Sequence, residues 1–285
     1  MPVTVVTDTT HYLPPETVAE LGVREVSLYV RDDEGQRREA DIDVAAFYAQ
    51  LRTAVSMPTT SQPSIGDFLA VYEPLAEAGH DVVSIHLAGA LSGTLESARQ
   101  AAADMAKRTS QRRIECVDSR TGAAGLGMVV LAAAAVARAG GDVDAVAERA
   151  RRASEDQKIW FAVETLEYLR RGGRIGAAQA WVGGALKIKP ILTFDGEVTP
   201  IERVRTTSRA RDRLLDYLQA RKDDGATAWC VQHIDAFEEA EALAERGRDV
   251  MGHDPLFVTQ VGPVVGAHIG PGMVGLGGVR PELLR

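Results

Sequence analysis

The chain has few cysteines, no excess of basic residues and no long apolar run. Its two cysteines, Cys116 and Cys230, lie in separate strand-like stretches without a CxxC pair, which favours reduced, buried thiols in a cytoplasmic protein over a disulfide. The net charge of -8 argues against sequence-independent binding to nucleic acid, because that binding needs a basic surface. The longest apolar run, residues 128–137, is too short to span a bilayer and is expected to be a buried helix. No secretory signal is expected, since residues 1–6 lead directly into a strand-like stretch.

Several motifs that would indicate a cofactor are also missing. There is no Walker A pattern, and the histidines lack cysteine or acidic partners at the spacing of a zinc site. Gly270, Gly272 and Gly275 match GxGxxG, but Pro271 interrupts the match and only ten residues follow it, so no βαβ unit fits. The segment around Ser92 does not have the Gly-x-Ser-x-Gly spacing of a hydrolase. We therefore expect no metal and no cofactor.

The pattern of apolar residues changes near the middle of the chain. In the first half, strand-like runs at residues 3–7, 82–87 and 114–117 alternate with helical segments such as 94–106 and 121–139, which is typical of βαβ units. The second half has strand-like runs at residues 159–163, 186–194, 197–204 and 226–232, helical segments at 208–220 and 236–246, and a hairpin signal at Asp195-Gly196. This α/β pattern predicts a Rossmann-like domain with a parallel sheet at residues 1–156. An α+β domain with a mostly antiparallel sheet is predicted at residues 157–285.

Loops rich in hydroxyl groups follow the predicted parallel strands, where open α/β sheets bind their ligands. They are Thr7-Asp8-Thr9-Thr10, Leu91-Ser92-Gly93-Thr94 and Asp118-Ser119-Arg120-Thr121, and a further hydroxyl segment spans residues 59–64. Hydroxyls and free N–H groups at helix starts suit an anion. Asp8 is predicted to accept bonds from loop amides, and Ser64 with Asp67 to form a capping box. For Ser92, ligand contact and helix capping both stay open.

Two other segments stand out. Residues 262–272 contain four glycines, two prolines and one imidazole, and predict a rigid loop that holds His268 in one pose, either in a core or in a site. Arginines gather at Arg170-Arg171-Gly-Gly-Arg174 and again at residues 203–209, including Arg205. Such a cluster is either a solvated face or a docking surface for an acidic partner or a phosphate.

Taken together, these segments resemble the DegV family of bacterial fatty-acid-binding proteins. The matching stretches run in order along almost the whole chain: Thr7-Asp8-Thr9-Thr10 with Leu13-Pro14, Thr59-Thr60-Ser61-Gln62-Pro63-Ser64, Leu91-Ser92-Gly93-Thr94, Val117-Asp118-Ser119, Leu169-Arg-Arg-Gly-Gly-Arg174-Ile, Lys187-Ile-Lys189-Pro190-Ile and Gly262-Pro263 through His268-Ile-Gly-Pro-Gly272. One departure precedes Ser92, in the segment from His86, where family members often have a pair of serines.

The resemblance implies a protein that binds one long-chain fatty acid between its two domains and has no catalytic centre of its own. A separate fatty acid kinase subunit would phosphorylate the carboxylate that this chain presents. Carried over by motif, the ligand contacts fall on Thr60, Ser61, Ser92, Gly93, Thr94 and His268, and kinase docking falls on Arg170, Arg171, Arg174 and Arg205.

Two other functions stay open at this point. Ser92 and His268 together suggest an acyl hydrolase or acyltransferase, although no acid is assigned to orient the imidazole. A relative of sugar-phosphate or dihydroxyacetone-type kinases is also conceivable, because hydroxyl loops at a sheet edge suit phosphates, but the missing nucleotide and metal motifs count against it.

Overall fold

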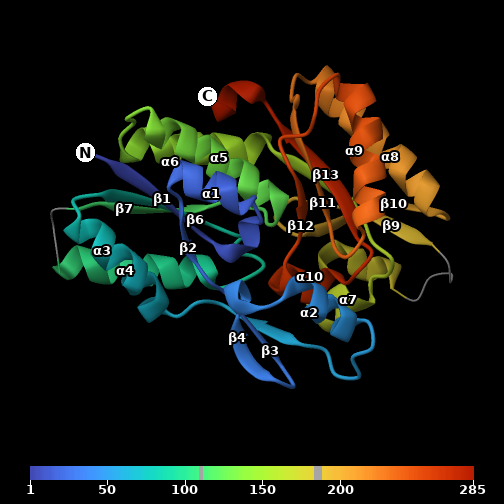
Figure 1. Ribbon diagram of the computed structural model, residues 1–285, viewed down its shortest axis with the longest axis horizontal. Coiled ribbons are helices and arrows are strands. Elements are labelled where there is room, and N and C mark those ends of the chain that lie inside the picture. The colour runs from blue at the N-terminus through green and yellow to red at the C-terminus, as the bar shows by residue number, and fades with distance from the viewer. Residues whose placement is uncertain (109–111, 183–187) are drawn as a thin grey trace.

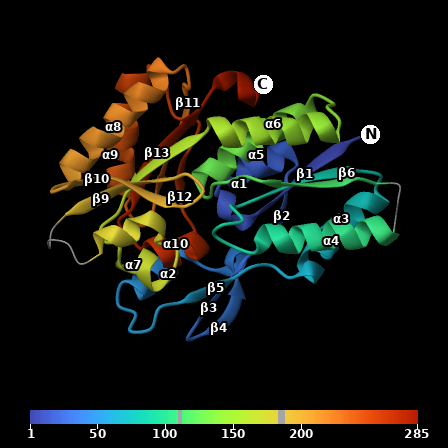
Figure 2. The ribbon, with the colours of Figure 1, turned by 180° about the vertical axis from the view of Figure 1, so that it is seen from behind.

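The computed structural model describes residues 1–108, 112–182 and 188–285. Four parallel strands of the first half form a sheet in the order β2-β1-β6-β7, and they are β1 (Val3–Asp8), β2 (Arg24–Val26), β6 (Asp81–His86) and β7 (Ile114–Asp118). Helices cover both faces of this sheet (Figures 1 and 2): α3 (Ile65–Glu77) and α4 (Thr94–Arg108) lie on one face, and α1 (Pro15–Leu21), α5 (Ala124–Arg138) and α6 (Val143–Asp156) on the other. The Rossmann-like parallel sheet is therefore confirmed.

A small antiparallel sheet extends from the first half, and the sequence pattern did not indicate it. Its order is β4-β3-β5, with β3 (Tyr29–Asp32), β4 (Gly35–Arg38) and β5 (Thr59–Ser61), and α2 (Val44–Leu51) lies in the connection between β4 and β5. These strands are three or four residues long and carry several charged side chains, so they lack the apolar alternation of a half-buried strand. The sheet matters for function because β5 carries Thr60.

The second half forms a six-stranded sheet in the order β10-β9-β8-β13-β11-β12. The strands are β8 (Lys158–Ala162), β9 (Lys189–Phe194), β10 (Val198–Val204), β11 (Ala228–His233), β12 (Val258–Gln260) and β13 (Val274–Val279), and every pairing except β11–β12 is antiparallel. The predicted hairpin at Asp195-Gly196 joins β9 to β10, whereas the first two residues of the strand predicted at 186–194 lie outside the described residues. The mostly antiparallel sheet is confirmed.

Helices α8 (Thr207–Asp223) and α9 (Phe237–Met251) cover the outer face of this sheet, and α7 (Glu167–Arg171) and α10 (Pro263–Ile269) lie at one of its ends (Figure 1). The inner face turns toward the first half of the chain. Helix α5 contacts β1 of the first sheet and also β8, β11 and β13 of the second. Its buried face consists largely of alanine and glycine, so both sheets can approach the helix closely. The chain crosses between the halves at Gln157, and we propose residues 1–156 and 157–285 as the two domains.

Residues 262–272 are not the rigid loop that the sequence predicts, because most of the segment is helix α10. Pro263 occupies the first helical turn, and Gly270 ends the helix with φ of 86°. Both positions follow the usual preference for proline at the start of a helix and glycine just after its end. Because the segment is rich in glycine and proline, its sequence does not indicate this helix, which is only seven residues long.

Candidate functional site

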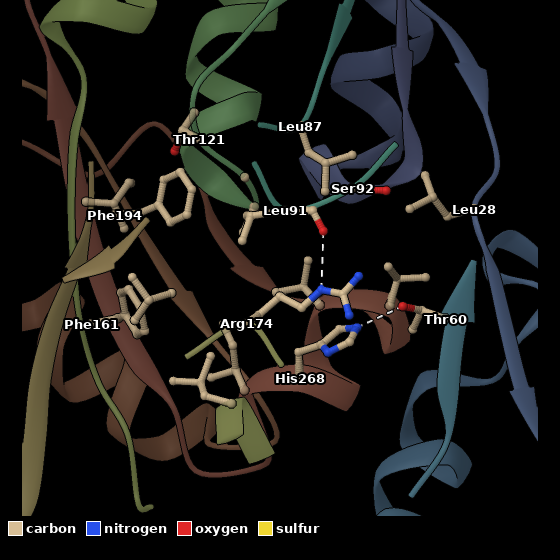
Figure 3. A pocket seen from close by; sticks show the side chains of 18 of the residues that line it. Leu28, Thr60, Leu87, Leu91, Ser92, Thr121, Phe161, Arg174, Phe194 and His268 are labelled. Carbon is tan, nitrogen blue, oxygen red and sulfur yellow. Dashed lines mark hydrogen bonds between the residues drawn. The ribbon is translucent and has the colours of Figure 1, made fainter. Parts of the chain in front are cut away.

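A cavity of about 330 Å³ lies between the two halves of the molecule, and both contribute to its wall (Figure 3). Its apolar lining comes from loops that follow strands of the first sheet, from the inner face of the second sheet, and from helices α7 and α10. The residues are Leu28, Leu87, Leu91 and Ala123 from the first half, and Ile159, Phe161, Leu169, Phe194, Val198, Val264, Val265, Ile269 and Met273 from the second. The volume and the mostly apolar wall are typical of a site for a small organic ligand.

Glycines of the central strand β13 make room for this cavity. Gly275 pairs with Phe161 on one side and with Gln232 on the other, and both neighbours line the cavity. A Cβ at Gly275 would lie 2.7 Å from the Cβ of Phe161, and one at Gly277 would overlap the side chain of Ile159. Gly275 belongs to the GxGxxG match that we judged false. Its role is to let side chains of β8 lie across the strand, not to cradle a dinucleotide.

Polar side chains gather at one part of the cavity wall: Thr60, Ser61, Gln62, Ser92, Arg174 and His268. In Figure 3, Thr60, Ser92, Arg174 and His268 lie away from Phe161 and Phe194, which line the other side. Thr60 on β5 and His268 on α10 come from different halves, and Thr60 Oγ1 is 2.8 Å from His268 Nε2. This pair is the centre of the candidate head-group site.

His268 is neutral near pH 7. Burial lowers the pKa of its imidazole from 6.5 to about 4, and the nearby Arg174 adds to the effect. Its Nδ1 is buried with no hydrogen-bond partner among the described residues, and the backbone of Gly172 packs against it so closely that a Cβ there would overlap the ring. A buried N–H without a partner is costlier than an unused lone pair, so we assign the ring hydrogen to Nε2. Nε2–H then donates to Thr60, whose own hydroxyl hydrogen is free to bind an anion in the cavity.

Ser92 lines the cavity but pairs with Thr94 and not with His268. Its Oγ is 2.9 Å from Thr94 Oγ1 and accepts a 3.4 Å bond from the Thr94 backbone N–H, close to the start of α4. Among the described residues, His268 Nε2 pairs with Thr60, so the Ser92–His268 dyad of a hydrolase does not form. Ser92 therefore contacts the helix start and also faces the cavity, and its contact with a ligand stays a prediction.

The other predicted ligand residues divide into two groups. Thr60, Ser61, Ser92 and His268 line the cavity, whereas Thr94 is fully buried behind Ser92 and Gly93 is not part of the wall. Gly93 has a different role, because a Cβ there would overlap the side chain of Gln62. Gln62 is a wall residue that the prediction missed, although it lies within the hydroxyl segment at residues 59–64.

The arginines of the predicted cluster also lie in two different places, one at the cavity and the others on the surface. Arg174 lines the cavity near His268, and its guanidinium donates to the carbonyl oxygen of Leu91 (3.2 Å; Figure 3) and to that of Gly172 (2.8 Å). Arg170 and Arg171 are exposed and bind Glu167, and their hydrogen bonds lower the pKa of that carboxyl to about 2. Arg205, beyond the end of β10, is exposed as well. Arg174 is thus a cation at the site itself.

Buried and partly buried contacts from the first half hold α10, and with it His268, in place. Glu39 accepts hydrogen bonds from the Val264 N–H and the Tyr12 hydroxyl, each 2.8 Å long, and from the hydroxyl of Thr9. Tyr48 donates to the carbonyl oxygens just before α10. Burial raises the pKa of Glu39, although its three donors favour the ionised form. Sequence patterns gave no sign of this cluster, whose members are far apart along the chain.

A second array, of Asp8, His86 and Ser84, has the connectivity of a catalytic triad. Asp8 Oδ2 is 3.0 Å from His86 Nδ1, and His86 Nε2 is 2.7 Å from Ser84 Oγ. All three side chains are fully buried, and the Tyr72 hydroxyl donates to Ser84, so no substrate can reach the serine. Asp8 also accepts bonds from the N–H groups of Thr10 and Leu87, as predicted for a structural carboxylate. The predicted capping box of Ser64 and Asp67 is confirmed too.

Comparison with known proteins shows the family. The family model "Uncharacterised protein, DegV family" matches residues 2–280. The chain belongs to the DegV family. A DegV domain-containing protein of Streptomyces coelicolor is 40% identical over 278 residues, which cover 96% of this chain and 97% of that protein.

Solved structures of family members have the same fold. A fatty-acid-binding DegV family protein from Thermus thermophilus is 34% identical, with a TM-score of 0.88 over 98% of this chain and all of that one. DegV of Bacillus subtilis, a fatty acid binding protein, is 31% identical, with a TM-score of 0.87 over the same shares.

The described residues of this DegV-family chain include neither a metal-binding cluster nor a membrane-spanning helix. No group of three or more histidine, cysteine, aspartate or glutamate side chains is placed to hold a metal ion. None of the helices combines the length and apolar character that crossing a membrane requires.

Proposed function

We propose that this protein binds one long-chain fatty acid in the cavity between its two halves, with the carboxylate at Thr60. The observation that carries the proposal is the Thr60–His268 pair, which lies with Arg174 at one side of a mostly apolar cavity. Ser61 and Ser92 add hydroxyl donors to the same part of the wall. The fatty-acid-binding relatives from Thermus thermophilus and Bacillus subtilis support this ligand class.

The chemistry of the wall matches both ends of such a ligand. Burying an acyl chain contributes about 0.8 kcal/mol per methylene, or roughly 11 kcal/mol for about fourteen methylenes before the cost of association. Each charge-assisted hydrogen bond to the carboxylate contributes about 1.5–3 kcal/mol. The tail therefore decides affinity, whereas the Thr60 hydroxyl and the Arg174 guanidinium decide where the carboxylate lies.

We further propose that this chain presents the bound carboxylate to a separate kinase subunit, which phosphorylates it to an acyl phosphate. In that step a carboxylate oxygen attacks the γ-phosphorus of the ATP held by the kinase, and ADP leaves. Ser92 is engaged by Thr94 and His268 is engaged by Thr60, so neither is poised to attack an ester. The exposed Arg170, Arg171 and Arg205 remain our candidates for docking the kinase.

Mass spectrometry of organic extracts, followed by calorimetric titration of delipidated protein with palmitate and oleate, tests fatty acid binding. We expect one fatty acid per chain, and a roughly tenfold weaker affinity for Thr60→Val, which removes one charge-assisted bond. Thr59→Val is the matched control, because Thr59 neighbours Thr60 on β5 but is exposed and does not line the cavity. Protein that neither carries nor binds a fatty acid would overturn the proposal.

A further inference from the structure

The part of the cavity away from Thr60 is not entirely apolar. Thr121 and Gln232 also line it, and Figure 3 shows Thr121 near Phe194, on the opposite side from Thr60. Thr121 follows β7 in the first half, and Gln232 belongs to β11 of the second. Both side chains are almost completely buried, with exposed fractions of 1% and 2%. A polar group in such a place needs a partner, since leaving it unpaired is costly.

The amide of Gln232 has a defined orientation. Its Oε1 accepts a 3.0 Å hydrogen bond from the backbone N–H of Ala124, the first residue of α5. The two hydrogens of Nε2 are left over, and Nε2 has no hydrogen-bond partner among the described residues. Gln232 pairs across the sheet with Gly275, which has no side chain to cover it. The donor therefore belongs to the cavity wall.

Thr121 brings a second group that needs a partner. Its Oγ1 makes no hydrogen bond to the other described residues, and the buried Oε1 of Gln157 makes none either. The two oxygens flank one spot, because a Cβ built on Gly125 would lie within 3.0 Å of both. Three polar groups around the start of α5 thus have unused hydrogen-bonding capacity, and two of them line the cavity.

We propose that Thr121 and Gln232 form a second polar subsite, which recognises a hydroxyl group within the acyl chain of the ligand. A hydroxyl accepts a bond from Gln232 Nε2 and donates one to Thr121 Oγ1, so it satisfies both groups at once, whereas a methylene satisfies neither. The proposal rests on the proposed function and narrows its ligand to mid-chain hydroxy fatty acids.

A positional series of hydroxystearic acids, with stearic acid as the reference, tests the subsite by titration of delipidated protein. A uniformly apolar wall would penalise every in-chain hydroxyl alike. If the subsite exists, the isomer whose hydroxyl reaches it should bind at least about fivefold more tightly than isomers whose hydroxyl is nearer to the carboxylate or nearer to the methyl end. Thr121→Val should remove that preference and bind stearate at least as tightly as the wild-type protein does, because a methyl group replaces a hydroxyl that stearate leaves unpaired; retained stearate binding also shows that the variant is folded. Gln232→Met should remove it as well.

Thr7→Val is the matched control, since Thr7 is fully buried, its hydroxyl is unpaired among the described residues, and it does not line the cavity. Affinities that do not depend on hydroxyl position in the wild-type protein would overturn the proposal, and would show that water satisfies the two groups. A preference that survives in Thr121→Val and Gln232→Met would overturn it as well. Failure of every fatty acid to bind, stearate included, would instead refute the proposed function.

Discussion

His268→Gln should make the protein less sensitive to mild acid. Burial, with a further contribution from Arg174, lowers the pKa of His268 from 6.5 to about 4 in the folded state. The unfolded chain keeps the ordinary value, so between these pH values the unfolded chain binds a proton that the folded protein does not. The free energy of unfolding therefore falls as the pH decreases from 6.5 to about 4, by about 1.4 kcal/mol per pH unit. Above pH 6.5 the group is neutral in both states and contributes no pH dependence.

Urea unfolding at pH 7.0 and pH 5.0 measures this contribution. About 1.5 pH units of the window are crossed, so the wild-type protein should lose about 2 kcal/mol more than His268→Gln between the two conditions. Glutamine suits the comparison because it keeps a side-chain amide that can donate to Thr60 while removing the titrating group. His253→Gln is the control, since His253 is exposed and does not line the cavity.

Equal losses for the wild-type protein and His268→Gln would refute the reasoning, because they would mean that the buried imidazole does not resist protonation. Fatty acid binding should change the pKa of His268 in the opposite direction. A carboxylate beside His268 favours the protonated ring and raises its pKa, so the acid sensitivity of the wild-type protein should shrink when a fatty acid is bound. An NMR titration of the ring would show the same shift directly.

Three further predictions follow from the contacts around the site. Glu39→Ala leaves the buried Val264 N–H and the partly buried hydroxyls of Tyr12 and Thr9 without their acceptor and should lower the free energy of unfolding by about 3 kcal/mol, and a loss below about 1 kcal/mol in urea would contradict this role. Gly172→Ala should weaken fatty acid binding about tenfold in a titration by displacing His268, with unchanged circular dichroism; an unchanged Kd would show that the ring position does not matter. The double variant Arg170→Glu/Arg171→Glu should slow phosphorylation by the kinase at least about tenfold at unchanged fatty acid affinity, and equal rates would exclude docking there.

Much of the fold could be predicted from local pattern. The strands that became β1, β6 and β7 are short apolar runs between helical segments, and they formed the expected parallel sheet. Strand β13 was missed, because a stretch with three glycines among six residues has neither the alternation nor the side chains of an ordinary strand. Its glycines make sense only beside Phe161 and Ile159, which the chain places more than a hundred residues earlier.

By itself, the sequence determined the class of each half and the hydroxyl-bearing loops, and it singled out His268 as a candidate site residue, since these depend on residues close together in the chain. Only the tertiary structure decided that His268 pairs with Thr60 and not with Ser92, that Arg174 lines the cavity, and that Thr94 does not. The physical reason is that burial and hydrogen-bond geometry depend on which surfaces of the two halves are in contact. A pKa near 4 for one histidine follows from that contact, and no local pattern contains it.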